Sequence, residues 1–210
     1  MKTYIIYDLE ATCWQDNTDK VMETIEIGAV RYSLHDNIFE PVDSFNSFIQ
    51  PVYNPILSSF CTELTSITQE QVNNAEQFPS VFPEFMKWAD RDETESMFCS
   101  WGEYDWKQFS RDCRLHKMDF PIKPEQIINL KTSFSDYCGT KKRFGVRRAL
   151  KRMDMEFEGA HHRGIDDAKN IAKIVKAMFD DGYRFVANSY TLKGETNGTN
   201  SRTRRQVHKS

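Results

Sequence analysis

The chain has 210 residues, of which 39% are apolar and 13% aromatic, enough for one domain with a sizeable core. Its formal net charge of −3 does not by itself predict a nucleic-acid partner. No apolar run is long enough to cross a membrane, and the start MKTYIIYD is charged too early for a signal peptide. We therefore expect a cytoplasmic protein, or a nuclear one in a eukaryote, with no membrane partner. Five widely spaced cysteines without a CxxC pair indicate reduced thiols.

The first part of the chain predicts strands. Residues 4–8 form an apolar run that ends in an acid, residues 24–32 (TIEIGAVRY) alternate with a strand period, and residues 44–49 (SFNSFI) again favour a strand. Because the three strand signals follow one another before any helix, they predict an antiparallel meander.

Helical signals dominate the rest. Residues 68–71 have the pattern of a capping box, residues 81–89 and 106–116 have helical spacing, a helix closes at 149–153, and residues 164–179 carry one apolar stripe. A buried strand is predicted at 96–100. We expect one α/β domain over residues 1–186, with a mixed sheet flanked by helices. Residues 187–210 are polar and basic, and we expect a disordered tail there.

Three carboxylates stand at predicted element ends. Asp8 and Glu10 lie two apart on a strand and so project from one face, where their repulsion calls for a cation. Hard oxygen ligands suit Mg²⁺ or Mn²⁺, although a lone pair of this kind is usually only solvated. Asp105 follows the strand at 96–100, where it serves equally well as a ligand or as a helix N-cap.

The start of the last helix offers two pairings. His161 with Asp166, and His162 with Asp167, are both five residues apart, so spacing leaves the choice open. Helical phase favours Asp167, because its face carries apolar residues, whereas Asp166 shares its face with Asn170, which we expect to be largely in solvent. Asp167 is then the inward carboxylate, with His162 on the loop before it.

The order D-x-E, D, H, D resembles the DEDDh exonucleases of the DnaQ-like superfamily, which have a ribonuclease H-like fold. Within it, four segments are similar to the Eri-type, 3′ histone-mRNA exonuclease group: residues 7–14 (YDLEATCW), 60–72 (FCTELTSITQEQV), 101–105 (WGEYD) and 162–172 (HRGIDDAKNIA). The resemblance covers roughly residues 3–186.

This resemblance implies a 3′→5′ exonuclease that releases 5′-nucleoside monophosphates with two divalent cations, Mg²⁺ or Mn²⁺. It implies that Asp8, Glu10, Asp105 and Asp167 hold the ions, and that His162 is the general base. An imidazole that titrates near neutrality suits that role.

The resemblance also implies a pocket for the terminal nucleotide. Phe60 and Leu64 would pack on one side of the base and Tyr104 on the other; the alternative is that Phe60 and Leu64 are ordinary core residues. The main chain at Ala11 and Thr12 would approach the sugar, where a contact to the 2′-OH would favour RNA.

Residues 140–152 (TKKRFGVRRALKR) contain seven basic residues and no acid. We predict that upstream nucleotides bind along this stretch, at Arg147 and Arg148 in particular, although such a run is more often a solvated helix face. The favoured function is an exoribonuclease that acts on single-stranded or stem-loop RNA ends. Two alternatives are a DNA 3′→5′ exonuclease of the proofreading kind and a catalytically inert nucleic-acid-binding module on the same fold.

Overall fold

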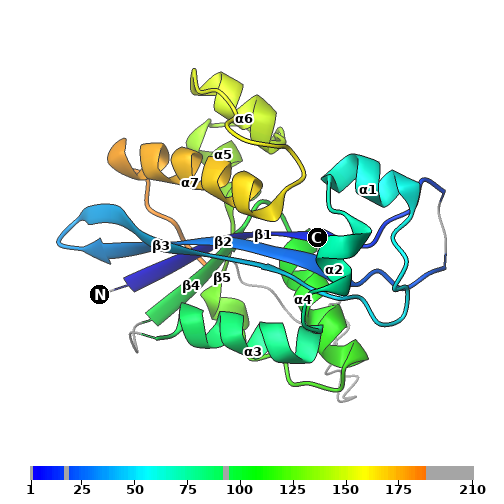
Figure 1. Cartoon of the computed structure of the whole chain (residues 1–210). Helices are drawn as coiled ribbons and strands as arrows, with labels where there is room; N and C mark the ends of the chain where they lie inside the picture. Colours follow the sequence, from blue (N-terminus) through cyan, green and yellow to red (C-terminus); the bar gives the residue numbers. More distant parts are fainter. Residues whose placement is uncertain (1, 17–18, 92–94, 188–210) are drawn as a thin grey trace, which may run out of the picture.

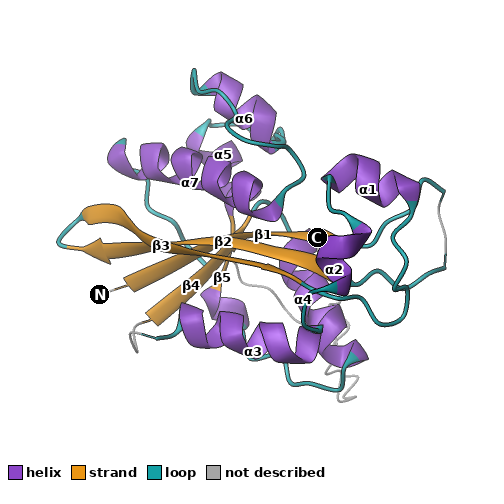
Figure 2. Cartoon of the chain, viewed as in Figure 1, coloured by secondary structure: helices purple, strands orange, loops and turns teal. Residues whose placement is uncertain are grey.

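The computed structural model describes residues 2–16, 19–91 and 95–187, so nearly all of the predicted tail at 187–210 lies outside the described residues. A five-stranded sheet in the order β3-β2-β1-β4-β5 runs through the middle, with helices on both faces (Figures 1 and 2). The strands are β1 (Lys2–Ala11), β2 (Thr24–His35), β3 (Ile38–Phe48), β4 (Glu95–Ser100) and β5 (Ile127–Asn129).

The sheet is mixed, as predicted. β1, β2 and β3 form an antiparallel meander, whereas β4 pairs in parallel with β1 and with β5. Both faces of the meander are covered, so residues of either parity are buried along β2. Ile27 and Ala29 pack toward one apolar cluster and Val30 toward another.

Helices cover the two faces and one end of the sheet. Figure 1 shows α5, α6 and α7 on one face, α3 and α4 on the other, and α1 and α2 near the end of β1. Their bounds are α1 (Ser59–Thr65), α2 (Gln69–Asn73), α3 (Phe78–Ala89), α4 (Tyr104–Leu115), α5 (Leu130–Tyr137), α6 (Val146–Arg152) and α7 (Gly164–Asp180), with a 3₁₀ turn η1 (Pro124–Gln126). None of the described helices is long and apolar enough to span a lipid bilayer.

Most predicted elements are present. The capping box at Thr68 and Gln71 is confirmed, with both reciprocal hydrogen bonds formed at the start of α2. α3 and α4 begin a few residues before the predicted starts, at Phe78 and Tyr104. α1, β5 and α5 were not predicted, because elements of three to eight residues are too short to display a clear period.

A glycine pair sets the height of α7 above the sheet. A Cβ on Gly28 of β2 would lie 2.0 Å from the carbonyl carbon of Gly164, the first residue of α7, and a Cβ on Gly164 would lie 3.0 Å from the carbonyl oxygen of Asp8. Because only glycine permits backbones to approach so closely, β2 and α7 meet directly at this point. The first turn of α7 therefore lies over the C-terminal part of β1, beside Asp8.

One expectation about α7 is wrong. Asn170 is fully buried instead of lying in solvent. Its side-chain amide donates to the carbonyl oxygens of Glu158 and Asp166 at 2.7 Å each, and its oxygen accepts from the backbone N–H of Glu158 at 3.0 Å. The segment before α7 folds back over this face of the helix, which helical phase alone does not reveal. Asp167 is nevertheless buried, as the phase predicted.

Candidate active site

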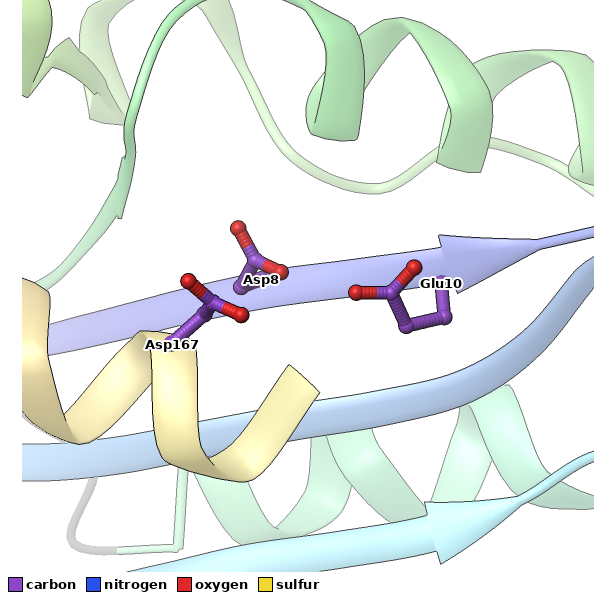
Figure 3. A group of neighbouring side chains, drawn as sticks. All are labelled: Asp8, Glu10 and Asp167. Carbon is purple, nitrogen blue, oxygen red and sulfur yellow. The ribbon is translucent and has the colours of Figure 1, made fainter. Parts of the chain in front are cut away.

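Three carboxylates from two distant parts of the chain converge at the centre of the molecule. Asp8 and Glu10 rise from the same side of β1, and Asp167 faces them from the first turn of α7 (Figure 3). One oxygen from each of the three lies within 4.8 Å of the others. Glu10 is 8% exposed and Asp167 5%, whereas Asp8 is partly accessible. The cluster is thus a largely enclosed acidic site.

The end of β1 is shaped for this cluster. Asp8 lies opposite Gly28 in the antiparallel register, and Glu10 lies opposite Glu26. The register shifts between Glu10 and Ala11, directly after the second acid. Such irregularities are common beside active sites because they redirect the chain and its side chains.

Asp105 borders the cluster from the other side of β1. It lies in the first turn of α4, is 4% exposed, and accepts a hydrogen bond of 3.2 Å from the backbone N–H of Leu9. The N-cap position of α4 belongs to Glu103, so the alternative that Asp105 is the helix cap is wrong. Asp105 lies outside the group of three that share the 4.8 Å limit, yet its charge acts on Asp8.

Burial raises the pKa of all four acids, and neighbouring negative charge raises it further at Asp8 and Glu10. Burial raises the pKa of Asp8 well above its usual range, and the charges of Asp105, Asp167 and Glu10 raise it further. Burial, followed by the charge of Asp167, raises the pKa of Glu10 to about 8. Burial raises the pKa of Asp105 to about 6, against the opposing effect of the Leu9 N–H. The protein by itself leaves this negative charge poorly compensated.

A divalent cation fits this donor set. The ligand atoms are hard carboxylate oxygens, the type that Mg²⁺ and Mn²⁺ prefer. Within the described ranges, no lysine or arginine forms an ion pair with Asp8 or Glu10. The negative charges of Asp8 and Glu10 can therefore be neutralised by a bound metal ion.

Two histidines adjoin Asp167. The backbone N–H of His162 donates to Oδ2 of Asp167 at 2.7 Å, with His162 in the left-handed region at φ 63°, whereas Nε2 of His161 lies 3.9 Å from Oδ1. The two rings meet edge to face with centroids 4.0 Å apart. Burial and the neighbouring His161 lower the pKa of His162, which favours a neutral imidazole that can accept a proton.

A buried ion pair anchors this histidine loop to the sheet. Glu26 of β2 is fully buried and accepts from Nε and Nη2 of Arg163 at 3.2 Å each, and from the backbone N–H of Gly164 at 3.0 Å. The Arg163 guanidinium lies 5.2 Å from the centre of the Phe48 ring. Sequence reasoning missed this pair. The available signal was an acid flanked by Ile25 and Ile27 in a buried strand, which requires a partner.

The predicted nucleotide-contacting side chains lie on helix surfaces. Phe60 is half-buried and Leu64 is 36% exposed, while Cys61 and Thr65 form the buried face of α1. Neither Phe60 nor Leu64 belongs to the described apolar clusters, which disfavours the alternative that they are core residues. Tyr104, at the start of α4, is 41% exposed.

Tyr104 lies next to the acids. Burial raises its pKa, and the charges of Asp105 and Glu10 add to that shift. Ala11 and Thr12 are buried, with the Thr12 hydroxyl accepting from the backbone N–H of Glu23 at 3.0 Å. The Thr12 side chain and the Thr12 backbone N–H, which donates to the carbonyl oxygen of Glu23 at 2.9 Å, are thus both engaged within the protein.

The basic stretch is tethered near the end of β4. Arg147 and Arg148 are exposed on α6. Nε1 of Trp101, which directly follows β4, donates to the carbonyl oxygen of Phe144 at 2.8 Å. Phe144, within the segment at 140–152, therefore lies beside the loop that leads into Asp105.

Comparison with known proteins shows the family to which the chain belongs. Residues 5–175 match the family model described as an exonuclease. The chain belongs to this exonuclease family. The 3′-5′ exoribonuclease 1 of Mus musculus is 34% identical over 197 residues, which cover 90% of this chain and 56% of that protein. The exonuclease chain thus spans about half the length of the curated relatives it matches.

Two solved structures resemble the exonuclease chain along nearly its whole length. One is a 3′-exonuclease studied for 3′-end-specific recognition of a histone mRNA stem-loop, with TM-score 0.83 and 30% identity over 92% of this chain and 88% of that one. The other is the nuclease domain of 3′hExo, a DEDDh family member bound to rAMP, with TM-score 0.83 and 31% identity over 90% and 97%. The predicted ribonuclease H-like fold and DEDDh family are confirmed, and this family implies divalent metal ions.

Proposed function

We propose that this chain is a metal-dependent 3′→5′ exoribonuclease that removes 5′-nucleoside monophosphates from RNA 3′ ends. The observation that carries the proposal is the convergence of Asp8, Glu10 and Asp167, with Asp105 held against the backbone of Leu9. RNA is favoured over DNA because the relatives are named exoribonucleases and the similar structures hold rAMP or concern a stem-loop RNA.

Each acidic residue has a defined task in this proposal. Asp8, Glu10, Asp105 and Asp167 would hold two divalent cations, Mg²⁺ or Mn²⁺. When bound, such ions neutralise the charge that develops on a scissile phosphate. Asp167 would hold its share of this charge at the first turn of α7, because the backbone N–H of His162 anchors its carboxylate.

His162 would accept the proton of the attacking water. Its lowered pKa keeps the imidazole neutral at physiological pH, which is the state a base requires. His161 provides a matched control, because its ring also lies near Asp167. We expect His162→Ala to abolish most activity and His161→Ala to retain most of it, measured as single-turnover cleavage. If His161→Ala abolishes activity and His162→Ala retains it, His161 is the general base.

The terminal nucleotide would lie between α1 and the start of α4. Phe60 and Leu64 present apolar surface from one helix and Tyr104 from the other, and stacking of this kind accepts any base. The backbone at Ala11 and Thr12 would lie beside the ribose. We expect Phe60→Ala to raise KM for a dinucleotide several-fold with little change in kcat.

We also propose that residues 1–186 form the exonuclease domain and that 187–210 form a basic tail outside it. The match to the exonuclease family at residues 5–175 supports this division. Deletion of 187–210 should leave cleavage of a dinucleotide unchanged.

The direct test is digestion of end-labelled substrates by the purified chain. Single-stranded RNA, a stem-loop RNA with a 3′ overhang and a matched DNA strand are each incubated with Mg²⁺ or Mn²⁺. We expect nucleoside 5′-monophosphates from RNA in order from the 3′ end, and slower release from DNA. Equal or faster release from DNA would favour the DNA exonuclease. RNA binding without any release of mononucleotide would favour the inert binding module.

A further inference from the structure

A hollow separate from the acidic site lies between the segment before β2 and the outer face of α4. Its volume is about 540 Å³. It is lined by three cationic residues and three apolar ones: Lys20, Arg111, Arg114, Val21, Met22 and Leu115. The segment is fixed against α4, since the side-chain amide of Gln108 donates to the carbonyl oxygen of Met22 at 2.9 Å. A buried hydrogen bond therefore holds the two walls of the hollow, the segment at Met22 and helix α4, against each other.

All the charged side chains that line the hollow are positive. No carboxylate lines it, and within the part of the chain that the structure describes neither Arg111 nor Arg114 forms an ion pair. Lys20 lies 5.0 Å from the centre of the Trp14 ring. Because the overall charge of the protein is −3, this concentration of positive charge is local. An anion would supply the charge that the hollow lacks.

One face of α4 leads from the catalytic region to the hollow. Tyr104, Lys107, Arg111 and Arg114 follow one another at spacings of three, four and three residues, which places them on one helix face. Ten residues of helix correspond to about 15 Å, so Arg114 lies only a few nucleotides' length beyond Tyr104.

We propose that this hollow binds a segment of RNA, with phosphates on Arg111 and Arg114 and a base or sugar against Val21 and Leu115. The proposal rests on the proposed exoribonuclease function. RNA is favoured over an acidic peptide because the helix face that carries Arg111 and Arg114 begins at Tyr104, beside the carboxylates. Apolar surface next to unpaired arginines is also the combination that single-stranded nucleic acid requires. The hollow lies with α4 on the sheet face opposite α6, so it is distinct from the basic stretch at 140–152 (Figure 1).

Equilibrium binding tests the hollow directly. The full chain carrying Asp8→Asn, which prevents cleavage, is titrated in Mg²⁺ against a fluorescent single-stranded RNA and a hairpin RNA with a 3′ overhang. We expect the added pair Arg111→Ala and Arg114→Ala to raise Kd about tenfold for at least one of the two RNAs. The slope of log K against log salt should become shallower by about 1.4, because two phosphate contacts are lost.

The matched control removes two positive charges elsewhere. Lys87→Ala on α3 and Lys169→Ala on α7 change exposed residues away from the hollow and should leave both Kd and the slope unchanged. If the alanine pair disturbs folding, Arg111→Gln and Arg114→Gln retain the side-chain bulk and should give the same loss. Equal binding by hollow and control variants for both RNAs would overturn the proposal. Loss of poly-glutamate binding without loss of RNA binding would assign the hollow to an acidic protein and also overturn it.

Cleavage of a dinucleotide separates this proposal from the proposed function. A dinucleotide is too short to extend from the acids to Arg114, so the hollow variant with Asp8 intact should cleave it at the wild-type rate. Wild-type protein that binds RNA through the hollow but cleaves nothing would sink the exoribonuclease and keep the hollow. If the wild type cleaves RNA normally and the hollow variant binds RNA as tightly as the Asp8→Asn protein, the exoribonuclease function stands and the hollow proposal is rejected.

Discussion

The buried centre of the site and its exposed rim are built in different ways. In the centre, Asp167 is held by the His162 backbone and the start of α7 by Glu26, with almost no access to solvent. On the rim, side chains such as Leu64 and Arg111 project from outer helix faces. The difference implies that the centre acts through a few irreplaceable atoms, whereas the rim acts through many small contributions. A rim substitution with an effect as large as one in the centre would break this comparison.

The largest effect is expected at the catalytic acids. Asp167→Asn removes one charge from the cluster with little change in shape, so cleavage of RNA should fall by about 10³-fold, or about 4 kcal/mol. Single-turnover rates with saturating Mg²⁺ or Mn²⁺ measure the loss. Asp166→Asn is the matched control on the same helix turn, because asparagine can still accept the 2.9 Å bond from the Ala160 N–H. Comparable losses in both variants would contradict the inward assignment of Asp167.

The next effect concerns the ion pair that anchors the histidine loop. Arg163→Ala leaves the Glu26 carboxylate buried without its cation, which should cost about 3–5 kcal/mol of stability. Glu26→Gln should cost less, because Arg163 retains access to water. Urea unfolding at pH 7 measures both, and the double variant should be more stable than Arg163→Ala alone. If Arg163→Ala unfolds like the wild type, the pair does not hold the loop.

A smaller effect is the pH dependence of the metal-free protein. The folded-state pKa of Glu10, about 8, lies above its ordinary value, so the folded state binds more protons than the unfolded state. This stabilisation is complete at low pH and is lost as the pH rises through about 8. Between pH 6 and 9 the free energy of unfolding should fall by roughly 2 kcal/mol. Glu10→Gln, or saturating Mg²⁺, should flatten the profile in thermal melts. A free energy of unfolding that rises from pH 6 to 9 would show that the pKa of Glu10 is not raised in the folded state.

Local periods in the sequence were sufficient to predict which way three acids of the centre face. Asp8 and Glu10 share a face because strands have a period of two, and helical phase selects Asp167 over Asp166. These rules are local, and they hold because each acid stands on a long, regular element. The same phase argument was wrong at Asn170, where the burial comes from the returning segment near Glu158, far enough along the chain that no local period encodes it.

The rim was harder to predict, for two reasons. The basic stretch is visible as a run of basic residues, but the cations of α4 are separated by two or three other residues each and become neighbours only in the helix. The hollow also requires Val21, which precedes Arg111 by ninety positions in the sequence. The Glu26–Arg163 pair has the same character, since it joins β2 to the start of α7. Contacts between distant segments are the part that single-sequence patterns omit.

The smallest expected effect is at the visible basic run. Arg147→Ala with Arg148→Ala removes two exposed cations of α6, while five others in the stretch remain to hold a phosphate backbone. KM for a long RNA should rise only a few-fold, about 1 kcal/mol, with kcat and dinucleotide cleavage unchanged. Steady-state kinetics at two salt concentrations measure it, since the loss should shrink as salt screens the phosphates. An unchanged KM would reject the role of Arg147 and Arg148. If RNA affinity falls more in this variant than in the Arg111 and Arg114 variant, the basic run is the main RNA contact. The five remaining cations of the run would then be unable to replace Arg147 and Arg148.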